Sequence, residues 1–143
     1  MADSFRIIPF RCVGYGCAVG EALRNRMCDD CVDTCYGACG VFMVAHVFFN
    51  GLSALMTGKG VVITIVDTCI FEFLASLVIP TFISYNTRRI VRKIVHNVRD
   101  TPVPVIKWGP TVAALLALAV SMKPVDGVVD LMLSATIRPL EYI

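Results

Sequence analysis

The residues that could carry chemistry begin with a series of closely spaced cysteines. The sequence places Cys28, Cys31, Cys35 and Cys39 in a C-x2-C-x3-C-x3-C arrangement, and cysteine thiolates bind zinc and iron–sulfur clusters. A helix would align all four on one narrow stripe, whereas the ligands of a cluster usually come from a loop that wraps around the metal. We therefore predict that the stripe consists of small apolar packing residues. A disulfide and a metal site are the alternatives, and we expect no cofactor.

Two acidic residues inside otherwise apolar runs form the second candidate site. Asp67 and Glu72 interrupt one run, while His46 and Asn50 lie in the run before it. A carboxylate in hydrocarbon is costly, so it faces the interior of a helical bundle, finds a partner or becomes protonated. If the two runs fold back on each other at residues 58 and 59, Asp67 lies level with Asn50, and Glu72 lies level with His46.

The angular separation of the two acids decides which of them faces the first run. Residues five apart are about 140° apart around a helix, so one face cannot present both. We predict that Asp67 faces the first run and pairs with Asn50, and that Glu72 turns toward another helix or a partner. The expected role of these groups is structural, as polar contacts between helices. A proton or ion pathway is the alternative.

Catalytic and nucleic-acid functions find no support in the sequence. The histidines are His46, inside an apolar run, and His96, in a basic stretch. Neither sits in a nucleophile–base motif, and no glycine-rich phosphate loop is present. The basic residues lie in one short stretch and lack interleaved aromatic residues that would stack on bases. We expect neither an enzyme nor a nucleic-acid partner.

The elements that position these residues are predicted to be membrane helices. Hydrophobic residues make up 57 % and charged residues 17 % of the 143 residues, whereas about a quarter of a soluble domain is charged. Crossing the hydrocarbon core takes about 20 helical residues. We predict an all-α integral membrane helical bundle, a single domain over residues 1–143, with three transmembrane helices over residues 34–57, 60–87 and 105–122.

The third span and the two flanking segments complete the predicted bundle. The uncharged stretch of the third span runs from Trp108 to Met122, which covers about 22 Å and is short for a span. A buried or re-entrant segment is the alternative. Residues 9–27 and 124–138 are predicted to form amphipathic interfacial helices. The first carries Gly16 and Gly20 at small-xxx-small spacing, and the second repeats Asp126, Asp130 and Ser134 every four residues.

The distribution of basic residues predicts the orientation. The loop at residues 88–107 is rich in lysine and arginine, and the loop between the first two spans holds only Lys59. The positive-inside rule places the basic loop on the cytoplasmic or matrix side, together with the N-terminus and its Arg6, Arg11, Arg24 and Arg26. The loop is either simply solvated or in contact with anionic lipid headgroups, such as those of cardiolipin. The side chains expected to make that contact are Arg88, Arg89, Arg92 and Lys93.

Three stretches of the sequence together resemble the mitochondrial fission process protein family. They are RCVGY at 11–15 with VGEALR at 19–24, VDT at 66–68 with LASLVIP at 74–80, and KW at 107–108 with KPVD at 123–126 and VDLML at 129–133. The residues that fall on the family's pattern are Gly20, Glu21, Asp67, Pro80, Trp108, Asp126 and Asp130. The sequence departs from that pattern in its cysteine stripe, at Lys123, where a histidine is expected, and at Glu72, where a glutamine is expected.

The resemblance implies a multi-pass protein of the mitochondrial inner membrane, without known catalytic residues, that supports membrane organisation, morphology, fission and integrity. The basic loop and the N-terminus then lie in the matrix. The first alternative is a structural accessory subunit of a respiratory-chain complex or ATP synthase, because a compact bundle with little soluble domain suits such a subunit. The second alternative is a small carrier or channel. The expected partners are membrane lipids and other inner-membrane protein subunits.

Overall fold

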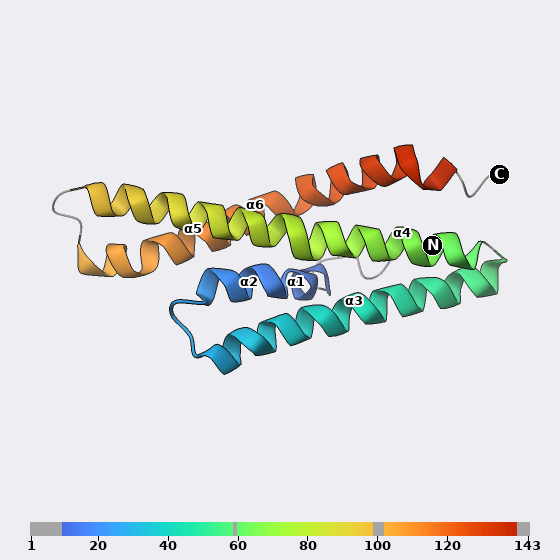
Figure 1. Ribbon diagram of the computed structural model, residues 1–143, viewed down its shortest axis with the longest axis horizontal. Coiled ribbons are helices and arrows are strands. Elements are labelled where there is room, and N and C mark those ends of the chain that lie inside the picture. The colour runs from blue at the N-terminus through green and yellow to red at the C-terminus, as the bar shows by residue number, and fades with distance from the viewer. Residues whose placement is uncertain (1–9, 59, 99–101, 140–143) are drawn as a thin grey trace.

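The computed structural model describes residues 10–58, 60–98 and 102–139, and every element in these ranges is helical. The chain order is α1 (Phe10–Gly14), α2 (Gly16–Leu23), α3 (Asp29–Thr57), α4 (Val61–Glu72), the π-helix η2 (Phe73–Val78), α5 (Ile79–Asn97) and α6 (Val103–Thr136). α4, η2 and α5 follow one another without a break and form one long rod (Figure 1). The predicted all-α fold is confirmed.

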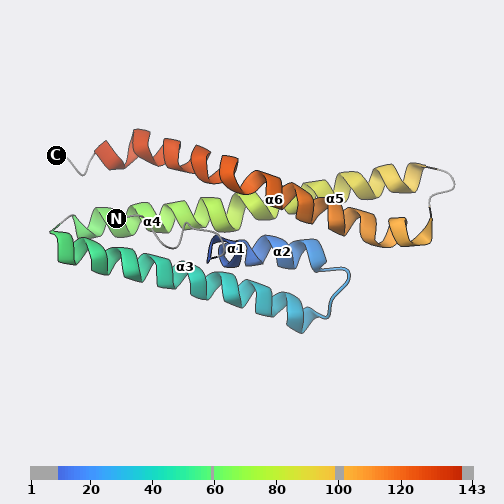
Figure 2. The same ribbon diagram turned by 180° about the vertical axis from the view of Figure 1, so that it is seen from behind.

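Three long antiparallel rods surround a short N-terminal segment. α3 runs opposite to the α4–η2–α5 rod, and α6 runs opposite to that rod again (Figure 1). In both views, α1 and α2 lie between α3 on one side and α5 and α6 on the other (Figures 1 and 2). α2 contacts α3, α5 and α6. The N-terminal segment therefore forms the centre of the bundle.

Each long rod is apolar enough and long enough to cross a membrane. They cover Asp29–Thr57, Val61–Asn97 and Val103–Thr136, with 29, 37 and 34 residues. At 1.5 Å per residue these are about 44, 56 and 51 Å long, compared with about 30 Å for a hydrocarbon core. The predicted segments 34–57 and 105–122 lie within these helices, and the segment 60–87 does so apart from Gly60. Every helix extends beyond the predicted bounds at one end or both.

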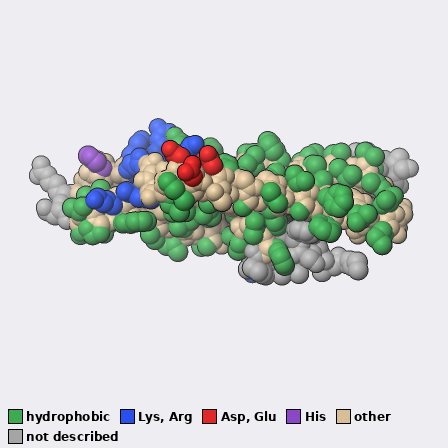
Figure 3. All heavy atoms as spheres, turned by 90° about the horizontal axis from the view of Figure 1, so that it is seen from below, with side chains coloured by type: hydrophobic (Ala, Val, Ile, Leu, Met, Phe, Trp, Pro, Cys, Tyr) green, Lys and Arg blue, Asp and Glu red, His purple; other side chains and the backbone are tan. Residues whose placement is uncertain are grey.

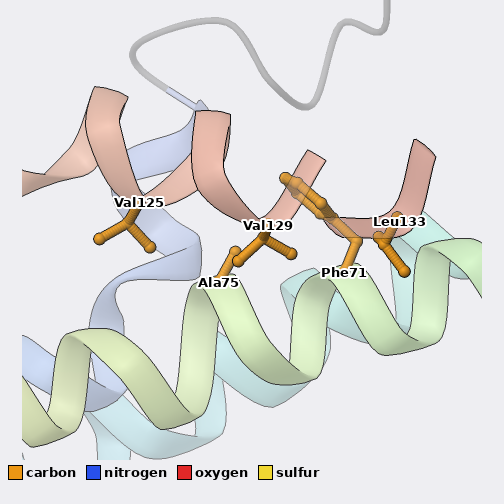
Figure 4. Close-up of a cluster of buried hydrophobic side chains, with 5 residues drawn as sticks. All are labelled: Phe71, Ala75, Val125, Val129 and Leu133. Carbon is orange, nitrogen blue, oxygen red and sulfur yellow. The ribbon is translucent and has the colours of Figure 1, made fainter. Parts of the chain in front are cut away.

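The prediction of a separate interfacial helix over residues 124–138 is wrong. α6 continues through Pro110 and Pro124 to Thr136. The reason is packing: one stripe of buried side chains runs along α6 on both sides of Pro124, namely Ala114, Leu118, Val125, Val129 and Leu133. Its C-terminal part packs against Phe71 and Ala75 of the central rod (Figure 4). This burial favours a continuous helix despite the hydrogen bond that each proline removes.

The prediction that residues 9–27 lie along the membrane surface is also wrong. Tyr15 and Ala18 are fully buried inside the bundle. The glycine spacing has the role expected of it, because a Cβ atom at Gly16 would lie 2.6 Å from the carbonyl oxygen of Cys35. Only glycine allows α2 and α3 to approach this closely. Residues 10–23 meet neighbours on several sides, so they act as a buried segment.

Two local features fix the ends and the continuity of the long helices. Asp29 and Asp30 occupy the first turn of α3, where acidic side chains favour the helix dipole. Gly58 ends the same helix with φ of +70°, a conformation that glycine adopts at no steric cost. In the central rod, the π-helix lies directly before Pro80. Proline lacks a backbone N–H and its ring crowds the carbonyl four residues earlier, so a widened turn there accommodates it.

Candidate functional site

Arg11 lies at the centre of a buried polar cluster that joins three parts of the bundle. Its side chain is 2 % exposed. Nη1 donates to both carboxylate oxygens of Glu72, at 3.0 and 3.1 Å, and to Ser76 Oγ at 2.9 Å. Nε and Nη2 donate to the two oxygens of Asp126, at 2.9 and 2.6 Å. One guanidinium therefore connects α1 to the central rod and to α6.

Aromatic rings enclose this guanidinium. Its central carbon lies 5.0 Å from the ring centre of Phe71 and 5.4 Å from that of Tyr15, within the range of cation–π attraction. The Tyr15 hydroxyl lies 3.3 Å from the carbonyl oxygen of Met122 and 3.4 Å from Asp126 Oδ1. The rings keep water away, so the ion pairs interact more strongly than surface pairs, and an unpaired charge here would be costly.

A chain of hydrogen bonds links the same cluster to α3. His46 Nδ1 lies 2.5 Å from Glu72 Oε1, and Asn50 Nδ2 lies 3.1 Å from His46 Nε2. Asn50 Nδ2 also donates to Thr68 Oγ1 at 3.3 Å. His46 and Asn50 thus bridge α3 and α4.

The pairing predicted for Asp67 is wrong. Asn50 bonds to His46 and Thr68, while Asp67 Oδ2 accepts a hydrogen bond from Arg138 at 3.4 Å. Arg138 also donates to Asp130 Oδ1 at 2.6 Å. The matched depths of Glu72 and His46 are correct. Glu72 turns toward another helix as predicted, because it binds Arg11 of α1, and it also contacts His46 of α3. Asp67 instead joins α4 to the end of α6, because its direction around the helix points away from α3.

A second ion-pair cluster lies where α2 meets α5. Arg88 Nη1 donates to the backbone oxygen of Glu21 at 2.5 Å, and Nη2 donates to its carboxylate at 2.8 Å. Arg24 donates to the other carboxylate oxygen at 3.2 Å. Ser84 adds a hydrogen bond from its hydroxyl to the backbone oxygen of Ala18, at 2.9 Å. The prediction that Arg88 contacts lipid headgroups is therefore wrong, because its side chain is buried.

The other predicted lipid-contacting residues are exposed at one end of the bundle. Arg89, Arg92 and Lys93 are exposed on the last turns of α5. Figure 3 shows that, on the face in view, charged side chains gather toward this end, while the described side chains over the remainder are mostly hydrophobic. Arg26 lies at the same end, with its guanidinium 5.9 Å from the ring centre of Trp108 at the start of α6. The prediction that Arg11 lies at this end is wrong, because its side chain is buried in the cluster with Glu72 and Asp126. Arg6 and Lys59 are outside the described residues.

Burial increases along the cysteine stripe, from the exposed Cys28 through the half-buried Cys31 and Cys35 to the buried Cys39. Cys39 is buried and donates to the backbone oxygen of Gly14 at 3.0 Å, and Cys35 packs beside Gly20. The packing role predicted for the stripe holds for these two. Cys28 is exposed, and its sulfur lies 2.8 Å from that of Cys31. In the described ranges, no three potential metal-ligating side chains gather at one place.

The acids and bases of these clusters connect helices, and where Glu21 and Arg24 border a groove of about 590 Å³ they are already paired with each other. A groove of about 880 Å³ lies between α3 and α4 and is lined by apolar side chains such as Met43, Phe48, Leu52 and Ile65. Glu72 borders it, but its carboxylate is fully buried and already paired. The groove therefore offers no free polar group that would orient a substrate. What the clusters can do chemically is fix the positions of the helices relative to one another.

Sequence reasoning missed Arg11 as the centre of the main cluster, although a signal for it existed. Arg11 stands among Phe10, Cys12 and Val13, and an arginine inside an apolar segment needs a buried partner. Ser76 follows Glu72 by four residues and so shares its helix face. Arg138 and Ser84 carried no comparable signal, because their partners lie 71 and 66 residues away in the sequence.

Comparison with known proteins identifies relatives over nearly the whole chain. The chain is 29 % identical to mitochondrial fission process protein 1 of Danio rerio, over 96 % of its own length and 88 % of the relative. It is 28 % identical to the protein of the same name from Homo sapiens, over 96 % and 87 %, and 26 % identical to that of Caenorhabditis elegans, over 96 % and 88 %. No family model and no solved structure matches. The resemblance seen in the sequence is confirmed.

Proposed function

From its relationship to the mitochondrial fission process proteins, we propose that the chain is a non-catalytic, multi-pass protein of the mitochondrial inner membrane that supports mitochondrial fission and membrane organisation. The observation that carries the proposal is the similarity over 96 % of the chain and almost 90 % of the relatives. Similarity of this extent includes all three long helices and the N-terminal segment, so it applies to the whole bundle.

The surface of the bundle supports a membrane location. Large apolar side chains are exposed along every long helix, including Val44 and Phe48 of α3, Val62 of α4, and Val120 and Leu131 of α6. In water such a surface would aggregate, whereas in lipid it is the expected outer face. The buried arginines and acids satisfy one another, as polar groups at membrane depth must.

The orientation that we propose places the charged end of the bundle in the matrix. Arg89, Arg92 and Lys93 extend α5 at that end, and the link between α2 and α3 adds Arg24 and Arg26. A positive end of this kind favours the matrix side and attracts anionic headgroups, such as those of cardiolipin. The part of α5 from residue 89 onward is therefore the segment that we propose to contact the lipid headgroups.

The non-catalytic assignment rests on how the polar groups are used. Arg11, Glu72 and Asp126 are engaged with each other, and Arg88 is engaged with Glu21. A group committed to an ion pair between helices is poorly placed to transfer a proton to a substrate. We propose that these clusters hold the N-terminal segment in the centre of the bundle, so that the protein acts as a rigid membrane body.

Deletion and complementation test the proposed function. Cells that lack the chain are expected to contain longer and more interconnected mitochondria, and the wild-type chain should restore their length distribution. An Arg11→Met variant should fail to restore it, and a Gly37→Ala variant, which has open space at its Cβ, should succeed, at equal expression measured by immunoblot. Unchanged mitochondrial length in the deleted cells would contradict a role in fission.

Native gels separate the free protein from an accessory subunit. Mitochondria are solubilised gently, separated by size and analysed by mass spectrometry across the gel. Migration alone or as a small homo-oligomer is expected. Comigration with a respiratory complex or ATP synthase at fixed stoichiometry would replace the proposal with that of a bound subunit.

A further inference from the structure

Two cysteines at the first turn of α3 are not used by the polar clusters. Cys28 is the N-cap residue with extended backbone, and Cys31 lies in the turn that follows. Their sulfur atoms are 2.8 Å apart and share a hydrogen bond. Residues three apart face the same side of a helix, and the pair forms a Cys-X-X-Cys sequence at a helix N-terminus, a setting in which reactive thiols occur.

We propose that Cys28 and Cys31 form a redox-active dithiol that exchanges with low-molecular-weight disulfides of the glutathione class. The geometry carries the proposal: the two thiols already touch, and closing the bond requires little movement of the backbone. Cys28 is exposed at the charged end of the bundle, so a water-soluble disulfide can reach it. The inference does not depend on the proposed role in fission.

The local electrostatics assign the attacking sulfur to Cys28. Its pKa is lowered, because the Cys31 thiol stabilises the Cys28 thiolate by hydrogen bonding, while the neighbouring Asp29 acts in the opposite direction. A lowered pKa increases the thiolate fraction at neutral pH, and the thiolate is the nucleophile in exchange.

The reaction proceeds in two exchanges. The Cys28 thiolate attacks one sulfur of the oxidant, forming a mixed disulfide and releasing one small thiolate. The Cys31 sulfur then attacks Cys28, which forms the Cys28–Cys31 bond and releases the second small thiolate. The two protein thiols lose two electrons, the oxidant gains them, and the two thiol protons end on the released thiols. Because the new bond lies within one helical turn, the packing of α2 on α3 stays intact.

Peptide mass spectrometry of the full-length protein in detergent tests the proposal. The reduced protein is equilibrated with mixtures of reduced and oxidised glutathione, alkylated and cut before aspartate. Cleavage at Asp29, Asp30 and Asp33 places Cys28, Cys31 and Cys35 on separate peptides, and fragmentation of the joined peptides separates Cys28 from Cys12 and Cys17, which lie on the same peptide. We expect the Cys28 and Cys31 peptides to remain joined, with the loss of two hydrogen atoms and no alkyl group on Cys28 or Cys31.

Single variants make the result decisive. Cys31→Ser should trap glutathione on Cys28, because the resolving thiol is gone, whereas Cys28→Ser should show no comparable adduct at Cys31. Cys35→Ser is the matched control and should oxidise as the wild type does. Full alkylation of both cysteines under oxidising mixtures, a bond from Cys31 to Cys35, or equal glutathione adducts in the wild type and Cys31→Ser would each overturn the proposal.

Discussion

Replacing Arg11 by methionine is predicted to destabilise the bundle strongly. The guanidinium donates five hydrogen bonds, three to Glu72 and Ser76 and two to Asp126. Methionine fills part of the volume and provides none of them, which leaves a fully buried carboxylate at Glu72 without its cation.

The expected magnitude follows from the burial of this pair. Removing one partner of a buried ion pair costs about 3–5 kcal/mol, because the remaining charge stays desolvated. At a factor of ten for each 1.4 kcal/mol, the ratio of folded to unfolded protein falls by about 140-fold to 3,700-fold. Arg11→Lys should lie between the wild type and methionine, since lysine keeps the charge but cannot reach both carboxylates with a planar fork.

The assay is unfolding of the full-length protein in mixed micelles, followed by helical circular dichroism. Arg89→Met is the matched control, because Arg89 is exposed on α5 and such changes usually alter the free energy of unfolding by less than about 0.5 kcal/mol. Repeating Arg11→Met in a Glu72→Gln background measures the coupling between the two residues. If Arg11→Met costs no more than the Arg89 control, or costs the same in both backgrounds, the argument for the central ion pair fails.

Three further variants test the remaining contacts in the same unfolding assay. Arg88→Met should cost about 3 kcal/mol, because it leaves the buried carboxylate of Glu21 with only the exposed Arg24 as a partner. A cost below about 0.5 kcal/mol, as expected for Arg89→Met, would return Arg88 to the lipid-facing set. Gly16→Ala should destabilise the bundle, because its Cβ would lie 2.6 Å from the backbone oxygen of Cys35. Its control, Gly37→Ala, has open space at the Cβ and should stabilise the bundle by up to about 1 kcal/mol. Equal effects of the two variants would contradict the close approach of α2 and α3. Leu133→Ala should cost about 2–5 kcal/mol if the end of α6 is packed, and a negligible cost would restore the interpretation of a surface helix.

The central position of the N-terminal segment explains why its polar residues matter. α1 and α2 meet α3, the central rod and α6, so a group on this segment can reach all of them (Figures 1 and 2). Arg11 and Glu21 each bond to helices that are distant in the sequence. Without water to satisfy them, such polar groups favour the one arrangement in which every charge has a partner.

Local sequence predicted the features that depend on the chain's own composition. The long uncharged runs predicted the three long helices, because a helix of sufficient length makes all its backbone hydrogen bonds within itself. The spacing of Gly16 and Gly20 indicated a close helix contact, and the cluster of basic residues after Tyr85 indicated a charged end. The resemblance to the mitochondrial fission process proteins was visible in short stretches and held over the whole chain.

The tertiary structure alone decided which polar groups meet. Depth along a helix can be predicted from a sequence, so His46 and Glu72 were matched correctly. The rotation of each helix about its axis and the insertion of the N-terminal segment between the helices cannot be predicted in this way. Asp67 therefore bonds to Arg138 and not to Asn50, and Arg88 bonds to Glu21 instead of facing lipid. A helix was predicted to start at Pro124, because local propensity favours proline in the first turn. Burial of the side chains from Ala114 to Leu133 instead favours one helix that continues past Pro124. Pairing and burial depend on contacts between residues far apart in the chain, and only the packed bundle contains them.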